Sequence, residues 1–332
     1  MHKISRRIKT AMIGIVAMTF FPINAIATEA VLVHDIAPPH PRYQHFYQMV
    51  ADVAKKTSGM LTIAMNPGGQ VLYPGQASLD AVRSGRVPLT FVNSAFLQSI
   101  HPSLGFINLP FSVTDETMLK PGATEAVLQL VRTYVEPTGL KVLGLMRGAD
   151  TIFVFKSHQV RKPEDLKGLK IRVAGPGVYQ DVVRSFGAEP SVIPAIEMGS
   201  ALQRGLINGM ITSPGGWGKN VQDVPQGCLV PGLIFYTYFM IADQKWLNGL
   251  PADQRQALID AARTNVTDKW RVMQQDDQQL VSALVASRGV TYWSVPANAL
   301  APWKERVEDV TSKFADANPE VMKKFRAIIG DR

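Results

Sequence analysis

Short apolar runs alternate with longer amphipathic segments from Val31 to the middle of the chain. Apolar runs bounded by Gly, Pro or Ser predict strands, whereas apolar positions spaced three and four residues apart predict helices. This alternation is typical of an α/β protein. The predicted strands are 31–33, 61–65, 89–92, 142–146, 152–155, 169–173, 192–193 and 210–211. The predicted helices are 42–57, 79–84, 125–134, 178–186 and 197–204.

Two distant stretches of the chain follow the same plan. Residues 81–87 and 201–207 each close a predicted helix at a glycine and lead into a predicted strand. The repeat predicts two similarly built domains that face each other. Ligands of open α/β sheets bind at strand ends, so the polar pairs that end these two strands are candidate ligand contacts. The pairs are Asn93 with Ser94 and Thr212 with Ser213.

The segment 252–288 contains no glycine or proline, and its apolar residues recur at helical spacing. This pattern predicts one long helix. At about 1.5 Å per residue it would extend roughly 54 Å, which exceeds the diameter of one small domain. We therefore expect a helix that braces both domains. Coiled-coil assembly is the alternative, although Asp277 interrupts the apolar stripe.

The N-terminal residues resemble a secretion signal. Four basic residues among the first nine precede the apolar run 11–21, and small residues at 25 and 27 form a cleavage site. A membrane anchor is the alternative, but Pro22 and Asn24 end the run well short of about twenty residues. The sequence therefore predicts a signal peptide at 1–27, a periplasmic mature protein and no membrane insertion after cleavage.

Composition narrows the class of the mature protein. The formal net charge is +8, and removal of the basic signal leaves about 305 residues with a charge of about +4. That charge is too small and too dispersed for nucleic-acid binding, but it suits anionic solutes. The single cysteine, Cys228, has no partner for an internal disulfide and no neighbouring histidine to activate it.

Motifs for catalysis, metals and nucleotides are missing from the sequence. His34, His40 and His45 lie close together, but prolines break any helix that would align them, and no cysteine or acidic set completes a metal site. The turn 175–177, Gly-Pro-Gly, lacks the third glycine and the acidic partner of a dinucleotide-binding loop. The sequence also has no nucleophile elbow, P-loop or HExxH motif. We therefore expect a binding protein without cofactor or metal rather than an enzyme.

One arginine stands in the middle of an apolar strand. Arg172 lies between Ile171 and Val173, just before the turn 175–177. A buried guanidinium is costly unless a carboxylate or phosphate pairs with it in forked geometry. The helix predicted from Val178 adds free N–H groups and a positive dipole end nearby. Arg172 is therefore the main candidate for binding a small acid, and a surface arginine on an edge strand is the alternative.

The sequence around Arg172 resembles a known family. Residues 163–173, Pro-Glu-Asp-Leu-Lys-Gly-Leu-Lys-Ile-Arg-Val, resemble the signature of the DctP family. These proteins are the extracytoplasmic solute-binding proteins of tripartite ATP-independent periplasmic (TRAP) transporters. Four further segments resemble family motifs in the same order along nearly the whole mature chain. They are 67–70, 106–111, 201–209 and 246–251.

The resemblance implies a two-domain periplasmic-binding-protein-like fold that closes on its ligand by a hinge, with a long helix across both domains. It places 28–150 with about 238–278 in domain I and 151–237 with about 279–332 in domain II. The ligand cleft lies between them, and Arg172 matches the family arginine that clamps a solute carboxylate. The implied partners are a small organic acid and the small and large subunits of a membrane permease.

Departures from the family pattern bear on the solute. Where many members carry a second arginine this chain has Thr-Ile-Phe at 151–153, and Arg147 is the candidate replacement. Ala195 stands in place of a phenylalanine, and hydroxyl residues follow Ile211 in place of amide and acid. Four aromatic residues either line the enlarged side or belong to the core. They are Trp217, Phe235, Tyr236 and Tyr238.

These departures predict a monocarboxylate with a bulky, aromatic or cyclic, apolar body. A C4-dicarboxylate is the alternative ligand, and a sensor kinase is the alternative partner. An enzyme that acts on a small acid in the same cleft would need an acid–base pair near Arg172, and the sequence offers none.

Overall fold

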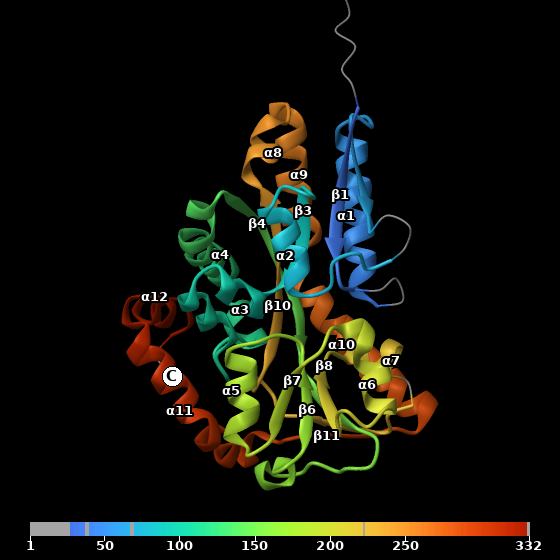
Figure 1. Ribbon diagram of the computed structural model, residues 1–332, viewed down its shortest axis with the longest axis vertical. Coiled ribbons are helices and arrows are strands. Elements are labelled where there is room, and N and C mark those ends of the chain that lie inside the picture. Colours follow the sequence, from blue (N-terminus) through green and yellow to red (C-terminus); the bar gives the residue numbers. More distant parts are fainter. Residues whose placement is uncertain (1–26, 37–39, 67–69, 222, 331–332) are drawn as a thin grey trace, which may run out of the picture.

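The computed structural model describes residues 27–36, 40–66, 70–221 and 223–330. The predicted signal peptide lies outside these residues except for Ala27. The described residues form two lobes, each built on one β-sheet, with the lobes joined in the middle of the long axis (Figure 1). We call the lobe that contains β1 lobe I and the other lobe II.

Lobe I contains a five-stranded sheet with the order β2-β1-β3-β10-β4. β1 pairs in parallel with β2 and β3, whereas β10 runs antiparallel to β3 and β4. The bounds of β2 agree with the predicted strand because its apolar run ends in chain-breaking residues. The strands are β1 Thr28–His34, β2 Leu61–Met65, β3 Leu89–Asn93, β4 Leu140–Asp150 and β10 Phe235–Asp243.

Helices cover both faces of the lobe I sheet. Successive residues of β1 point to opposite faces of the sheet and enter different cores. Leu32 packs with α1 and α9, whereas Val33 packs with α2 and α4. The helices are α1 Arg42–Lys56, α2 Gln76–Arg83, α3 Asp115–Met118, α4 Ala123–Val135, α8 Gln244–Gly249 and α9 Ala252–Asn265. Short 3-10 segments are η2 Ser94–Ser99, η3 Pro102–Asn108 and η4 Glu136–Thr138.

Lobe II contains a six-stranded sheet with the order β11-β9-β5-β8-β6-β7. Its strands are β5 Ile152–Phe155, β6 Lys170–Val173, β7 Glu189–Val192, β8 Gly209–Thr212, β9 Gln226–Leu229 and β11 Thr291–Ser294. Its helices are α5 Val178–Ser185, α6 Met198–Gln203, α7 Pro214–Asn220, α10 Trp270–Arg288 and α11 Ala301–Ala317. Its 3-10 segments are η5 Pro163–Leu166, η6 Ala195–Glu197 and η8 Ala297–Ala299.

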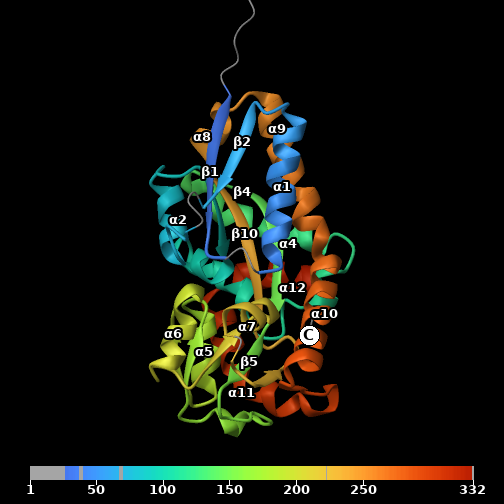
Figure 2. The ribbon, with the colours of Figure 1, turned by 90° about the vertical axis from the view of Figure 1, so that its right-hand side faces the viewer.

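Within the described residues the chain crosses between the lobes at four places, the last of them near the C-terminus and described below. β4 ends at Asp150 in the lobe I sheet, and β5 begins at Ile152 in the lobe II sheet. The return crossing lies between β9 and β10, and the backbone N–H and the hydroxyl of Thr151 both donate to the carbonyl of Ile234 there. The third crossing is the segment from α9 to α10, which runs along one side of the molecule (Figure 2).

The prediction of one uninterrupted helix over 252–288 is wrong. α9 ends at Asn265, the 3-10 segment η7 covers Thr267–Lys269, and α10 starts at Trp270. The hydroxyl of Thr267 accepts a hydrogen bond from the backbone N–H of Leu145 in β4, at 3.2 Å. This contact, 122 residues away along the chain, holds the segment against the sheet where the helix is interrupted.

The C-terminal helix α12 (Pro319–Ile329) lies outside the lobe to which the predicted division assigned it. Residues from about 279 onward were expected in domain II, but α12 packs against α4 and η3 of lobe I. The rings of Phe325 and Phe106 are 4.7 Å apart, and Lys120 Nζ donates to the Ile329 carbonyl at 2.8 Å. The apolar face of α12 is therefore buried on lobe I.

Candidate functional site

A cavity between the lobes contains Arg172. Its walls come from the segment after β1 in lobe I, from β6, β8 and α7 in lobe II, and from the start of β10. The cavity volume is about 30 Å³, which is room for one or two water molecules. An organic acid therefore enters only if the lobes separate or the lining side chains move. The polar and charged lining includes Asp35, His40, Arg172, Thr212, Ser213 and Tyr236.

Arg172 is only 2 % exposed, so the alternative of a surface arginine is wrong. β6 lies between β8 and β7, and it is therefore an inner strand rather than an edge strand. Nε of Arg172 donates to the carbonyl of Ile193 at 2.7 Å, and Nη1 donates to the carbonyl of Ile211 at 3.0 Å. Nη2 has no hydrogen-bond partner among the described residues. The guanidinium thus has unused donors at the cavity.

Three other predicted contacts line the same cavity. Tyr236 donates its hydroxyl proton to the Ile211 carbonyl at 3.0 Å, and Thr212 is 2 % exposed at the end of β8. Ser213 caps α7 by accepting from Gly216 N at 3.0 Å. Together with Arg172, these residues line the cavity from β6, β8, α7 and β10.

His40 connects the lobes at this cavity. Its Nε2 lies 3.1 Å from Ser213 Oγ, and its Nδ1 accepts from the backbone N–H of Arg42 at 3.2 Å. Burial, together with the nearby charge of Arg42, lowers the pKa of His40 to about 3. The ring is therefore neutral, with its proton on Nε2, and it donates to Ser213. In the sequence, His40 was considered only as a metal ligand and was rejected in that role.

Asp35 is a cavity residue that the sequence reasoning missed. It directly follows β1, is partly buried, and faces the same cavity as Arg172. Burial raises the pKa of its carboxyl, whereas the Arg172 charge and its own backbone N–H act in the opposite direction. The available signal was its position, since an acidic residue at the end of a parallel strand lies where α/β proteins bind ligands.

Asn93 and Ser94 do not line the cavity. The side-chain oxygen of Asn93 accepts from the backbone N–H of Ala95 at 2.9 Å and so caps η2. Ser94 Oγ donates to Asn108 at 2.5 Å and lies 3.4 Å from the hydroxyl of Tyr179 in lobe II. Ser94 thus belongs to the contact between the lobes, and Asn93 belongs to the end of β3 in lobe I.

Trp217 is a core residue, which was the alternative interpretation of this side chain. It is 1 % exposed, and Nε1 donates to the carbonyl of Val224 at 2.7 Å. Its ring packs against Gly227, where a β-carbon would overlap it. Phe235 also faces away from the cavity, because its ring stacks on Trp270 at 5.7 Å. Tyr238 does line the cavity, beside Tyr236 on β10.

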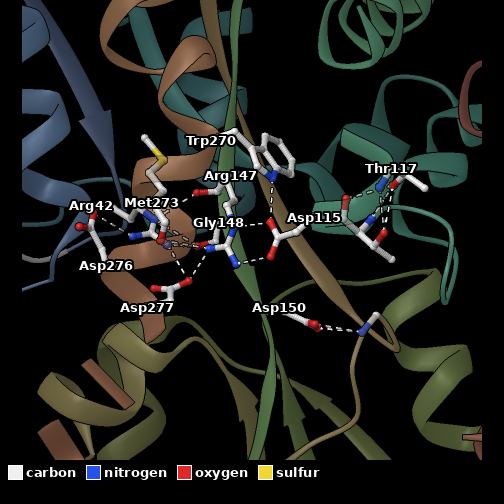
Figure 3. Close-up of polar contacts among 12 residues, drawn as sticks. Arg42, Asp115, Thr117, Arg147, Gly148, Asp150, Trp270, Met273, Asp276 and Asp277 are labelled. Atoms are coloured by element: carbon white, nitrogen blue, oxygen red, sulfur yellow. Dashed lines mark hydrogen bonds and ion pairs between the residues drawn. The ribbon is translucent and has the colours of Figure 1, made fainter. Parts of the chain in front are cut away.

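Arg147 does not replace the missing second arginine, because its guanidinium is fully engaged elsewhere (Figure 3). Nε and Nη2 donate to the two carboxylate oxygens of Asp115 at 2.7 and 2.9 Å, and Nη1 pairs with Asp277. Arg42 binds the same oxygen of Asp277 from the other side at 2.7 Å. Burial alone would lower the pKa of Arg147, but the bonds to Asp115 and the charges of both carboxylates raise it.

A larger cavity of about 410 Å³ lies beside this ion-pair network. It is lined by Arg147, Asp277 and Asp150, among others. Burial raises the pKa of Asp150 to about 7, although the N–H of Gly232 at 3.0 Å favours the ionised form. Arg147 is already paired with the carboxylates of Asp115 and Asp277, so it is not free to bind the carboxylate of a ligand in this cavity. The Arg172 cavity is therefore the candidate site, despite its smaller volume.

Metal binding finds no support in the described residues, where no group of three His, Cys, Asp or Glu side chains could hold an ion. His45, for example, pairs with Asp276 at 3.2 Å, away from the cavity. In the part of the chain that the structure describes, none of the helices has the length and apolar character needed to cross a bilayer.

The chain matches the family model of DctP, described as bacterial extracellular solute-binding protein, family 7, over residues 32–318. A similar relative is the C4-dicarboxylate-binding periplasmic protein DctP of Rhodobacter capsulatus, with 22 % identity over 94 % of this chain and 95 % of the relative. Another is the ectoine-binding periplasmic protein TeaA of Halomonas elongata, with 24 % identity over 72 % of this chain and 73 % of the relative.

Solved structures have the same fold. DctP7 of Bordetella pertussis, an extracytoplasmic solute receptor binding pyroglutamic acid, superposes with a TM-score of 0.81 and 19 % identity, covering 90 % of this chain and 100 % of that one. A TRAP periplasmic solute-binding protein of Sulfurospirillum deleyianum with bound succinate has a TM-score of 0.80 and 20 % identity, covering 90 % and 98 %. The predicted two-domain fold and the prediction of a binding protein rather than an enzyme are confirmed. The chain belongs to DctP, the bacterial extracellular solute-binding protein family 7.

Proposed function

We propose that this protein is a TRAP solute receptor that binds a small organic acid between its lobes, with the acid's carboxylate on Arg172. The position of Arg172 carries this proposal. The side chain is 98 % buried, two backbone carbonyls hold it in place, and it keeps unused donors at the cavity. A carboxylate that accepts from these donors forms the charge-assisted bond that a buried guanidinium requires.

The solute in this proposal is a monocarboxylate with a bulky, aromatic or cyclic body. Among the described residues that line the cavity, Arg172 is the one arginine, and Arg147 lies outside this lining, paired with Asp115 and Asp277. A second carboxylate on the ligand would therefore have no matching cation. Ala195 lines the cavity without filling it, and Tyr236 and Tyr238 offer ring surfaces beside it. The ligands of the relatives vary, from dicarboxylates to ectoine, so they do not identify the solute here.

Binding in this proposal requires a hinge motion. The cavity holds about 30 Å³, which is far less than the volume of a ring-containing acid. The lobes therefore separate to admit the ligand and close over it. A ligand populates the closed form only through contacts that it makes better there than in the open form. Contacts to both lobes, from Arg172 on one side and the segment after β1 on the other, satisfy that condition.

Replacement of Arg172 by Ala tests the central contact. We expect the affinity for the native acid to fall by about 2–5 kcal/mol, because the ligand charge would be buried without its partner. Arg184→Ala is the matched control, since Arg184 is an exposed lobe II arginine whose ion pair is with Asp181 on its own helix. Equal binding by the Arg172 variant and the wild type would contradict the proposal.

A thermal-shift screen of small acids tests the kind of ligand. An acid at 100 times its dissociation constant adds about 2.7 kcal/mol of stability, so the best acid is easily recognised. We expect cyclic or aromatic monocarboxylates to give the largest shifts. A largest shift with succinate, together with no shift for aromatic acids, would contradict the monocarboxylate proposal.

The proposed partner is a membrane permease with a small and a large subunit. Membership of the family supports this partner. The genes that neighbour the coding gene provide the check, and we expect both permease subunits among them. A sensor kinase in their place would favour the alternative partner.

A further inference from the structure

The cavity contains one cationic and one anionic side chain that face it from opposite lobes. Arg172 comes from β6 in lobe II, and Asp35 follows β1 in lobe I. The two groups are near enough for the charge of Arg172 to lower the pKa of Asp35. They are nevertheless not joined by an ion pair, because no contact within 4.0 Å connects them. Each therefore keeps its capacity to bind a ligand group of opposite charge.

In the described part of the chain, Asp35 has no side-chain partner for a hydrogen bond or an ion pair. Its carboxylate forms no hydrogen bond or ion pair with another described side chain, although burial opposes its ionisation. An ionised carboxylate in such surroundings is costly unless a donor or a cation compensates it. Arg172 is compensated better, because two of its nitrogens donate hydrogen bonds to backbone carbonyls. Of the two charged groups in this cavity, Asp35 thus has the smaller compensation from the protein.

The charges of the cavity decide which ligand fits. His40 is neutral because burial lowers its pKa to about 3, and the remaining polar lining consists of hydroxyl and amide groups. Arg172 and Asp35 therefore give the cavity a formal charge of zero. A simple carboxylate would bring a second negative charge into the same small space as Asp35, where the low dielectric makes like charges repel. A ligand with both a negative and a positive group would leave the charges balanced.

We infer that the solute is a zwitterion, with its carboxylate on Arg172 and a protonated nitrogen on Asp35. This inference rests on the proposed function and names the ligand class for the same site. The expected class is a cyclic or aromatic amino acid, or a ring acid that carries an amidinium. Such a ligand contacts a different lobe with each of its charged groups, so both contacts form together only when the lobes are close.

Pairs of compounds that differ in one nitrogen test the inference. The probes are pipecolate with cyclohexanecarboxylate, and phenylalanine with 3-phenylpropanoate, both enantiomers of each amino acid being used. Calorimetry on the full mature protein measures the six affinities. We expect the nitrogen-containing member of at least one pair to bind at least tenfold more tightly than its partner.

Two variants locate the effect. Asp35→Asn keeps the shape of the side chain and removes its charge, so we expect the preferred amino acid to bind at least tenfold more weakly and its carbocyclic partner to bind as well as or better than before. Arg172→Ala should weaken both members of the pair. The melting temperature of each unliganded variant shows that it is folded, and the wild-type comparison needs no variant at all.

The outcomes separate the two proposals. If the simple carboxylates bind as tightly as the amino acids, or if Asp35→Asn leaves the preference unchanged, the zwitterion inference is wrong while the organic-acid receptor stands. The zwitterion inference is also wrong, and the receptor proposal stands, if some acid binds in the thermal-shift screen but neither amino acid binds. A third pair is mandelate and phenylglycine, in which a hydroxyl replaces the ammonium group. Equal affinity for these two compounds would also overturn the inference, because Asp35 would then select a neutral donor. If Arg172→Ala binds every acid like the wild type, the proposed function itself is wrong.

Discussion

Nε2 of His40 lies 3.1 Å from Oγ of Ser213, and this hydrogen bond joins lobe I to lobe II beside the candidate site. The contact depends on the absence of a side chain at Gly215, where a β-carbon would overlap the His40 ring. It also depends on a neutral imidazole, because Nδ1 must accept from Arg42 N while Nε2 donates to Ser213. The bond between the lobes is therefore sensitive to pH.

Acid should destabilise the protein through His40. Burial lowers its pKa to about 3, whereas the unfolded chain has the ordinary value of 6.5. Between these values the unfolded state binds more protons, so the contribution of His40 to stability is complete above pH 6.5 and is lost as the pH falls. At pH 5.5 the expected loss relative to pH 8 is about 1.4 kcal/mol.

Urea unfolding at pH 8 and pH 5.5, for the wild type and for His40→Gln, measures this contribution. The variant should lack that part of the pH dependence. An identical pH dependence in both proteins would show that His40 is not buried as a neutral ring.

Asp150 should produce the opposite pH dependence. Burial raises its pKa to about 7, from 3.8 in the unfolded chain, even though Gly232 N donates to it. Stability from this group is complete below pH 3.8 and is lost as the pH rises through 7, because the folded state must give up its proton. Asp150→Asn should therefore stabilise the protein more at pH 8 than at pH 5.5, by roughly 1–2 kcal/mol. Equal effects at the two pH values in urea unfolding would contradict this assignment.

Gly175 should be required for the close approach of the lobes. A β-carbon at this position would lie 2.5 Å from the β-carbon of Ala95, and these residues belong to different lobes. We expect Gly175→Ala to fold with a nearly unchanged melting temperature when unliganded, but to bind its acid at least tenfold more weakly. Gly249→Ala is the matched control, since nothing lies within 4 Å of a β-carbon there. Wild-type affinity in the Gly175 variant would show that closure does not bring these two residues together.

Arg147 should be important for stability and not for ligand contact. Its loss would leave Asp115 and Asp277 without their shared arginine, and removal of one partner from a buried ion pair costs about 3–5 kcal/mol. Arg147→Met should therefore lower the free energy of unfolding by that amount. Arg172→Ala should show the reverse pattern, with a small change in stability and a large loss of binding. A direct role for Arg147 in holding the acid would instead make the two variants lose affinity equally.

The parts of the fold that local pattern determines could be predicted from the sequence. The strands at Leu61–Met65 and Ile152–Phe155 have the bounds that their apolar runs indicate, because breakers or polar residues flank each run. Arg172 could also be identified from the sequence, because a guanidinium on an apolar strand is costly unless it has a specific partner.

The remaining features depend on contacts between distant residues. The interruption at Thr267 lies where its hydroxyl bonds to Leu145, and no local pattern in a helical segment reports such a contact. Arg147 was assigned to the ligand because the sequence does not reveal that Asp115 and Asp277 meet beside it. The position of Asp35 at a strand end was a signal in the sequence, but its place in the same cavity as Arg172 depends on the docking of the two lobes.

The carbonyl of Ile211 accepts hydrogen bonds from both Arg172 Nη1 and the Tyr236 hydroxyl, each at 3.0 Å. A free arginine side chain has about 2 kcal/mol of rotamer entropy to lose when a ligand fixes it. Here that loss has already taken place during folding, so ligand binding need not order the guanidinium again. A lysine at 172 would keep the charge but could not donate to Ile193 and Ile211 while facing the cavity, because its three donors share one atom. The site is therefore preorganised for a planar, forked cation, and charge alone would not reproduce it.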